Sequence, residues 1–332
     1  MAPLNTLFCF LSTLSLFVSA SGYQLVQNYN ASNWFDSFFY NNGPDPTGGT
    51  VNYTTLAQAQ ALGLTKIVNN QVYFGAESTQ VVSGIGSDFG RKSVWLQSNL
   101  EFTHGVLIGD FAHVPSSACG TWPAFWTIHN EGNNNGEIDI FESFSDTPHN
   151  YMTLHTTNPS LNCTFNPPDN SETGRVDNGT TDCNLHTDQP NQNYDGCSIR
   201  APDGSYGDAL NQNGVVYAME WTSAHIRIWY WPGGTVPSDI TNGNPNPAGW
   251  GMPAGNFDTT NGGNCDLDAN FLSQGVWFDI TFCGMEAGGD AWSSYGDCAA
   301  KTGVATCEDY VRNNPSAFTS AYFLVNSVKI YQ

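Results

Sequence analysis

The chain has 332 residues, of which 40% are hydrophobic and 13% aromatic, so it can bury a substantial core in one large domain or two modest ones. Only nine Lys and Arg side chains stand against thirty Asp and Glu, which gives a formal net charge of −21. Such a surface repels phosphate polymers and anionic membranes, which argues against nucleic acid or a membrane as partner and favours a neutral polymer.

The first element along the chain is an uncharged N-terminal segment. It is apolar from Leu7 to Val18 and ends in Val-Ser-Ala at Ala20, which is the small-residue spacing of a signal-peptidase site. The segment is too short to cross a bilayer with flanking anchors. We therefore predict a signal peptide over residues 1–20, a mature chain that begins near Ser21, and a secreted, extracellular protein.

Short β-branched and aromatic runs, bounded by Gly, Pro, Asn and Asp, follow throughout the mature chain. This pattern predicts an all-β sandwich of antiparallel sheets. No linker or internal repeat interrupts residues 21–332, which predicts a single catalytic domain, and no apolar tail follows the last strand, which predicts no lipid anchor. Helices are expected only at 55–62 and 307–313. The clearest predicted strands are 105–111, 215–221, 226–231, 276–282, 322–325 and 328–332.

The cysteines predict a disulfide framework. The sequence contains nine, and removal of Cys9 with the signal peptide leaves eight, an even number that allows four disulfides in an exported chain. No C-x-x-C pair or H-E-x-x-H motif indicates zinc. Residues 158–214 are rich in Asn, Asp, Gly and Pro and are expected to form long surface loops that disulfides cross-link. Four sequons could accept glycans, at Asn30, Asn52, Asn162 and Asn178.

Three acids lie within six positions of one predicted strand, in a chain with only 12% charged residues. Side chains alternate faces along a strand, so Glu137 and Asp139 point the same way while Glu142 points to the other face. A single-residue β-bulge between them restores the parity and places all three acids on one surface. Ile138 and one or both of Ile140 and Phe141 then pack into the core.

Close carboxyl groups favour acid–base chemistry, because repulsion makes one of them hold its proton near neutral pH. An ionised nucleophile beside a protonated acid, roughly 5 Å apart, is what retaining glycoside hydrolysis requires. An exposed acidic strand and a divalent-ion site are the alternatives. The strand has no nearby Asn or Gly loop to complete a calcium cage, so no metal and no cofactor are predicted.

Residues 136–142 (GEIDIFE) resemble the signature of glycoside hydrolase family 16, in the form with one extra residue before the last Glu that typifies the laminarinase-like branch. Residues 119–126 (CGTWPAFW) are similar to the family's G-x-W-P-A-x-W segment, and residues 152–156 (MTLHT) to its T-L-H-T segment. Further matches keep their order along the chain, at 45–53, 90–94, 217–220 and 327–332. The resemblance is closest to the secreted basidiomycete-type laminarinases.

This resemblance implies a jelly-roll β-sandwich with an open concave cleft. The expected enzyme is monomeric, needs no cofactor, and cleaves β-1,3-glucan and mixed-linkage β-1,3-1,4-glucan at internal bonds of the polysaccharide. Glu137 would be the nucleophile and Glu142 the general acid/base. Asp139 would be a helper that hydrogen-bonds Glu137 and tunes its basicity.

Four further residues are candidates for substrate binding. Trp126 aligns with the aromatic floor under the sugar beside the scissile bond, although an isolated Trp at this spacing is more often a core residue. For Trp122 both interpretations stay open, a contact to the sugar or a core residue. His155 is expected beside the acid/base or as a structural histidine. Arg91 is a candidate contact to sugar hydroxyls at the cleft rim, with a surface ion pair as the alternative.

The chain departs from close relatives at two expected Trp positions, where it has residues 133–135 (NNN) and Met285-Glu286. These departures leave the identity of the sugar open, and Trp292 is the residue expected to compensate from a nearby loop. Three rival functions remain: an endo-β-1,3-galactanase on the same fold, a cell-wall glucan transglycosylase, and a noncatalytic glucan-binding lectin.

Overall fold

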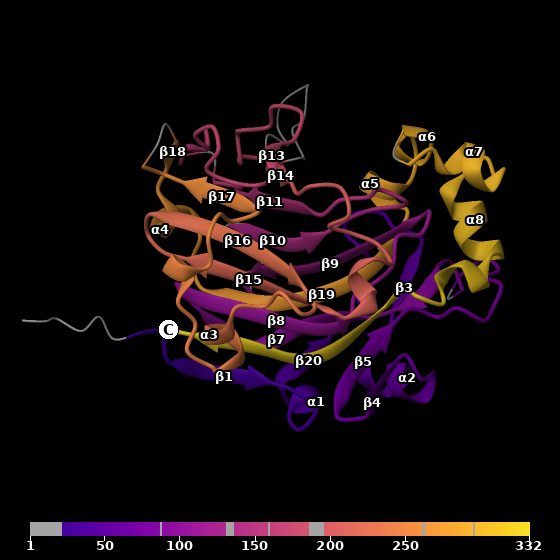
Figure 1. Ribbon diagram of the computed structural model, residues 1–332. Helices are drawn as coiled ribbons and strands as arrows, with labels where there is room; N and C mark the ends of the chain where they lie inside the picture. The colour runs from indigo at the N-terminus through magenta and orange to yellow at the C-terminus, as the bar shows by residue number, and fades with distance from the viewer. Residues whose placement is uncertain are drawn as a thin grey trace, which may run out of the picture.

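Two antiparallel sheets of eight strands each lie face to face in the computed structural model (Figure 1). The structure describes residues 22–332 except 87, 131–135, 159, 186–195, 261–262 and 295. The predicted signal peptide therefore lies outside the described residues. None of the helices in this described part combines the length and apolar character that a membrane-spanning helix needs.

The first sheet, called here the outer sheet, is built around the C-terminal strand. Its strand order is β17-β16-β15-β8-β20-β5-β4, and β1 also pairs with β20. The strands are β17 (Gly255–Asp258), β16 (His225–Pro232), β15 (Val215–Trp221), β8 (Gly105–His113), β20 (Tyr322–Tyr331), β5 (Gln71–Gly75), β4 (Thr65–Val68) and β1 (Leu25–Tyr29).

The second sheet, called here the cleft sheet, contains the strand with the three acids. Its order is β13-β14-β11-β10-β9-β19-β7-β2. The strands are β13 (Arg175–Val176), β14 (Cys197–Arg200), β11 (Tyr151–His155), β10 (Glu137–Glu142), β9 (Thr121–Ile128), β19 (Gln274–Phe282), β7 (Trp95–Phe102) and β2 (Phe38–Tyr40). Two short pairs lie beside the sheets, namely β3 (Val51–Tyr53) with β6 (Arg91–Ser93), and β12 (Cys163–Thr164) with β18 (Asn264–Cys265).

The helices are short and lie outside the sheets. The two predicted helices are confirmed: Thr55 caps α2 through a capping box, and α8 has the expected bounds. Several one-turn helices were not predicted, because four residues carry no helical periodicity. The helices are α1 (Trp34–Ser37), α2 (Leu56–Ala61), α3 (Ser238–Thr241), α4 (Leu267–Asn270), α5 (Gly284–Ala287), α6 (Ala291–Ser294), α7 (Cys298–Thr302) and α8 (Cys307–Asn313), with 3₁₀ turns η1 (Leu210–Gln212), η2 (Pro247–Gly249) and η3 (Pro315–Phe318).

Aromatic side chains from both sheets fill the space between them. Phe125 and Phe278, on neighbouring strands of the cleft sheet, stack with ring centroids 4.8 Å apart. From the outer sheet, Phe111 meets Phe125 edge-on at 5.4 Å, and Phe323 meets Phe278 at 5.4 Å. These rings are almost fully buried, so they contribute a large share of the apolar burial that holds the sheets together.

Four disulfides join the eight described cysteines, which confirms the predicted number. Two of them, Cys119–Cys298 and Cys283–Cys307, tie the ends of β9 and β19 to helices α7 and α8. The other two are Cys163–Cys265, between β12 and β18, and Cys183–Cys197, within the long loop region. These bonds close loops of up to 179 residues. They lower the conformational entropy of the unfolded chain and so stabilise the fold.

Candidate active site

Strand β10 contains the predicted bulge. Its register on β9 runs through Asp139 opposite Trp126 and then shifts by one residue, so that Glu142 lies opposite Ala124. Trp126 and Ala124 are two positions apart and point to the same face of β9, so Asp139 and Glu142 share that face with Glu137. The core side of the bulge is fully buried, with no exposed area on Ile138, Ile140 and Phe141.

Glu137 and Glu142, but not Asp139, line a cavity of about 230 Å³ on the outward face of the cleft sheet. Glu137 and Glu142 form part of its floor, together with Trp122 and His155. Its walls come from the loop at 177–180, from Tyr151, Thr153 and Ser198 on neighbouring strands, and from Met285 and Glu286. A larger cavity of about 480 Å³ lies against the outer sheet and contains none of the acids of β10, so it is not the candidate active site.

Trp122 contacts one of the acids, and His155 lies against the other two. The indole Nε1 of Trp122 donates a hydrogen bond to Glu142 Oε1 at 2.7 Å, and the ring is 9% exposed. His155 faces Glu137 across the β10–β11 pair, and its Nε2 lies 3.2 Å from Asp139 Oδ2. The structure thus brings Trp122 against Glu142, and His155 against the other two acids of the strand.

Two glycines with positive φ border this cluster. Gly136 has φ 76° and directly precedes Glu137, and a Cβ added there would lie 2.4 Å from the ring of Phe271. Gly196 has φ 61°, and its Cβ would lie 2.6 Å from Nδ1 of His155. Larger residues at these two positions would therefore displace groups in the site.

Asp279 on β19 is a partly buried acid that sequence reasoning missed. Its Oδ1 accepts a hydrogen bond from Trp126 Nε1 at 2.9 Å, and its Oδ2 accepts one from the Tyr53 hydroxyl at 3.3 Å. The signal was present in the predicted strand 276–282, because period-two alternation places Trp277 and Asp279 on one face. Asp279 therefore fixes the orientation of two aromatic rings beside the acid cluster.

Burial raises the pKa values of all the acids in this cluster. Burial, followed by repulsion from Asp139, raises the pKa of Glu137 to about 8. The same two causes raise the pKa of Glu142 to about 7, although His155 and the Trp122 hydrogen bond act in the opposite direction. Burial and then Asp279 raise the pKa of Asp139 well above its usual range. The three acids therefore cannot all be ionised at neutral pH.

One set of side chains in the site could hold a metal ion. Glu137, Asp139 and His155 each offer one ligand atom, and these atoms lie within 4.8 Å of one another. Two of these ligand groups already contact each other, because His155 Nε2 lies 3.2 Å from Asp139 Oδ2. The prediction that no metal is needed stays a prediction.

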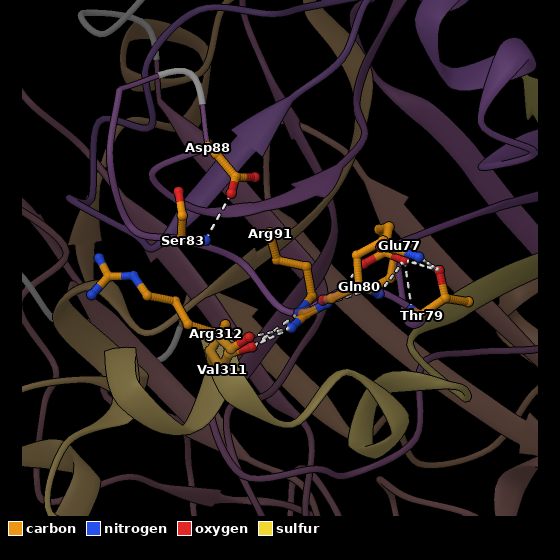
Figure 2. A network of polar contacts seen from close by, with 8 residues as sticks. All are labelled: Glu77, Thr79, Gln80, Ser83, Asp88, Arg91, Val311 and Arg312. Carbon is orange, nitrogen blue, oxygen red and sulfur yellow. Dashed lines mark hydrogen bonds and ion pairs between the residues drawn. The ribbon is translucent and has the colours of Figure 1, made fainter.

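Arg91 corrects one of the sequence predictions, because it is fully buried and does not lie at the cleft rim. Figure 2 shows its guanidinium between the 77–80 loop and the end of α8. Nη1 donates to Glu77 Oε2 at 2.8 Å, and Nη2 donates to the carbonyl of Val311. The guanidinium also lies over the ring of Phe318, 5.0 Å from its centroid. Arg91 is a structural residue that ties two distant segments together.

Replacing Arg91 by Met is therefore expected to lower the free energy of unfolding by roughly 3–5 kcal/mol, because Glu77 is left as an unpaired, largely buried charge. Denaturant unfolding with the disulfides intact measures this change. Lys301→Met is the matched control: Lys301 pairs with Asp146 on the surface, and its loss is expected to cost about 0–1 kcal/mol. Equal losses in the two variants would contradict the structural role of Arg91.

The structure describes one of the two departures and corrects the expectation for Trp292. Residues 133–135 lie outside the described residues. Met285 is 52% exposed at the wall of the cavity, so a flexible thioether lies where a Trp was expected. Trp292 does not compensate: it is 1% exposed, and its Nε1 donates to the carbonyl of Val304 at 2.9 Å. Its ring lies 5.6 Å from that of Tyr310 on α8, which makes it a core residue.

A sandwich of two antiparallel sheets that carries paired glutamates across a β-bulge, within a cavity on one sheet face, defines a β-sandwich glycosidase. The model of the XgeA-like catalytic domain of glycoside hydrolase family 16 matches residues 38–331. The chain therefore belongs to glycoside hydrolase family 16, as the resemblance of its motifs implied.

Fungal proteins are among the relatives of this chain. A probable glycosidase of Schizosaccharomyces pombe is 40% identical over 316 residues, which span 94% of this chain and 70% of that protein. An endo-1,3(4)-β-glucanase of Arthroderma benhamiae is 36% identical over 318 residues, or 95% of this chain and 66% of that protein. A probable endo-1,3(4)-β-glucanase of Aspergillus niger is 36% identical over 97% of this chain, which spans only 42% of that protein.

Two solved structures have a similar fold and cover almost the whole chain. Laminarinase 16A from Phanerochaete chrysosporium, solved with 6-O-glucosyl-laminaritriose in both donor and acceptor sites, has a TM-score of 0.80 and 36% identity over 94% of this chain and 100% of that chain. An elongating family 16 β-1,3-glucosyltransferase has a TM-score of 0.81 and 35% identity over 93% of this chain and 100% of that chain. The predicted jelly-roll sandwich is confirmed.

Proposed function

We propose that this chain is an endo-acting, retaining glycosidase that cleaves β-1,3-glucan and mixed-linkage β-1,3-1,4-glucan. The bulge in β10 carries the proposal, because it places Glu142 on the same strand face as Glu137 and Asp139, and the two glutamates line one cavity. The relatives named endo-1,3(4)-β-glucanases and the laminarinase with bound glucan support the same substrate class. The open cavity on a sheet face suits cleavage within a long chain.

In this proposal Glu137 attacks the anomeric carbon while Glu142 gives its proton to the leaving glycosidic oxygen. The carbon–oxygen bond to the leaving chain breaks, and a covalent glycosyl ester forms on Glu137. Glu142, now ionised, takes a proton from a water molecule, which attacks the same carbon and releases Glu137. Trp126 is proposed to support the sugar beside the scissile bond, where its ring is only partly buried.

Double displacement requires Glu137 to be ionised and Glu142 to be protonated, which is opposite to the order of their separate pKa values. We propose that Asp139 reverses this order of protonation. Repulsion from Asp139 is the largest charge effect on Glu137, so the two carboxyls titrate together as a pair. Asp139 is 2% exposed and also lies near Asp279, so an anion is least favoured there. The proton stays on Asp139, and Glu137 carries the charge.

The reaction is tested by product analysis after incubation of the protein with laminarin, mixed-linkage β-1,3-1,4-glucan and β-1,3-galactan. Internal oligosaccharides from the two glucans are the expected result. Cleavage of galactan alone would keep the mechanism and overturn the substrate. Binding without cleavage of any polymer would favour a noncatalytic lectin instead.

Transglycosylation is the second candidate, and the 35% identity to the elongating glucosyltransferase favours it. The same glycosyl ester on Glu137 would then pass to a sugar hydroxyl in place of water. Products longer than the starting oligosaccharide, detected by mass spectrometry, distinguish transfer from hydrolysis.

We also propose that residues 21–332 act as one secreted, monomeric catalytic domain after removal of residues 1–20. The four disulfides support export, because such bonds persist in oxidising compartments. The high acid content agrees with an extracellular setting.

The position of the alkaline limb of the pH–rate profile should report the proton on Glu142. Because Glu142 must be protonated, kcat/KM is expected to fall as the pH rises through about 7. Trp122→Phe removes a hydrogen bond that lowers the pKa of Glu142, so its alkaline limb should move to higher pH. Trp126→Phe, which loses a bond to Asp279 instead, is the control for ring substitution. An unmoved limb in Trp122→Phe would contradict the role of Glu142.

A further inference from the structure

A row of directly paired residues crosses the cleft sheet from the acids to its far edge. Asp139 on β10 lies opposite Trp126 on β9, and Trp126 lies opposite Trp277 on β19. Trp277 lies opposite Gln97 on β7, and Gln97 lies opposite Phe39 on β2. Directly opposite residues of antiparallel strands point to the same face. Phe39 therefore lies on the face that carries the candidate active site.

Aromatic rings line much of this route. The rings of Trp126 and Trp277 have centroids 5.3 Å apart, and those of Trp277 and Trp95 are 5.7 Å apart. Tyr53 lies 5.2 Å from Trp95. Trp95 and Trp126 are partly exposed, while Trp277 is 6% exposed between them. An apolar strip thus continues from the acid cluster toward the edge strand β2.

Phe39 stands at the end of this strip with 57% of its surface exposed. Its neighbours on β2, Phe38 and Tyr40, point into the core and are each 3% exposed. A single exposed apolar residue is common on protein surfaces. Phe39 differs because it continues a row that begins at the catalytic strand, and because the amide of Gln97 lies beside it as a hydrogen-bonding group.

We propose that Phe39 and Gln97 form a distal subsite that binds a glucosyl unit several residues away from the bond that is cleaved. Four strand spacings separate β10 from β2, or roughly 19 Å, which only an oligosaccharide of several units can span. The exposed ring contacts the apolar face of the pyranose, and the amide contacts its hydroxyls. This inference rests on the proposed function, since it extends the glucan path of the same cleft.

The chain-length dependence of cleavage tests the subsite. Phe39→Ala is expected to lower kcat/KM on laminariheptaose by between about twofold and tenfold, while cleavage of laminaritetraose, which is too short to reach β2 from the acids, stays unchanged. The variant should also shift the positions at which laminariheptaose is cut. Phe39→Trp keeps an aromatic face and should retain wild-type behaviour on both oligosaccharides.

Val26→Ala is the matched control, because Val26 is 49% exposed on β1 of the outer sheet, away from the cleft. Its kinetics should equal those of the wild type. Equal losses of Phe39→Ala on both oligosaccharides, or no loss on either, would overturn the subsite. A wild-type protein that cleaves neither oligosaccharide, nor laminarin, would instead overturn the proposed function, so the two failures are distinguishable.

Discussion

Glu137→Gln is expected to lower kcat on laminarin by on the order of 10⁴-fold or more. The amide has nearly the shape of the carboxyl but cannot attack the anomeric carbon, so the covalent intermediate does not form. The release of reducing ends from laminarin measures the loss. Because the side chain lines an open cavity and only its charge changes, the fold should be retained, and circular dichroism and thermal unfolding check this.

A smaller substitution identifies the role of Glu137 more sharply. In Glu137→Ala, added azide can enter from the face that the carboxylate occupied, so an activated aryl β-glucoside is expected to yield the α-glucosyl azide. An azide product of β configuration would mean that Glu137 is the acid/base and not the nucleophile. Full activity of Glu137→Gln would contradict covalent catalysis at this residue.

Glu142→Gln is expected to lower kcat on laminarin by about 10²- to 10⁴-fold, because the leaving sugar departs without a proton. The loss should be far smaller on an aryl glycoside whose phenolate leaves readily, since that first step needs no acid. The ratio of the two losses, measured in one series with the wild type, is the diagnostic quantity.

The configuration of the azide product also distinguishes the roles of the two glutamates. In Glu142→Ala the covalent ester on Glu137 still forms, and azide attacks it from the opposite face, so the expected product is the β-glucosyl azide. The pH profile of this variant should also lose its alkaline limb. Equal losses on laminarin and on the activated glycoside would contradict the assignment of Glu142 as the general acid.

The arrangement of the acids explains why one strand can supply both roles. A regular strand would direct Glu142 into the sandwich, where Phe141 now lies fully buried. The bulge turns Glu142 outward, against the indole of Trp122, and leaves Asp139 between the two glutamates. Because Asp139 is buried next to Asp279, it is the acid best suited to keep a proton and leave Glu137 charged.

The spacing of polar and apolar residues within single strands and helices carried the correct predictions. It predicted the sandwich, the strands at 215–221 and 276–282, the helix at 307–313 and the bulge between Asp139 and Glu142, all of which the structure confirms. These features depend on local periodicity, which can be read from the spacing of apolar residues along the chain.

Features that depend on contacts between distant segments could not be predicted in the same way. A lone Arg beside a strand has the same local pattern at a cleft rim and in a buried ion pair, so the burial of Arg91 against Val311 required the fold. The same holds for Trp292, which packs against Tyr310 of α8, and for Asp279, whose partners Trp126 and Tyr53 come from other strands.

The sequence by itself therefore determined the fold class, the number of disulfides and the face of β10 that carries the acids, because each follows from residue type and spacing along the chain. Only the tertiary structure decided which cysteines pair, which Trp rings reach the cleft, and that Phe39 shares a sheet face with Asp139. These outcomes depend on strand order, which places segments far apart in the chain side by side.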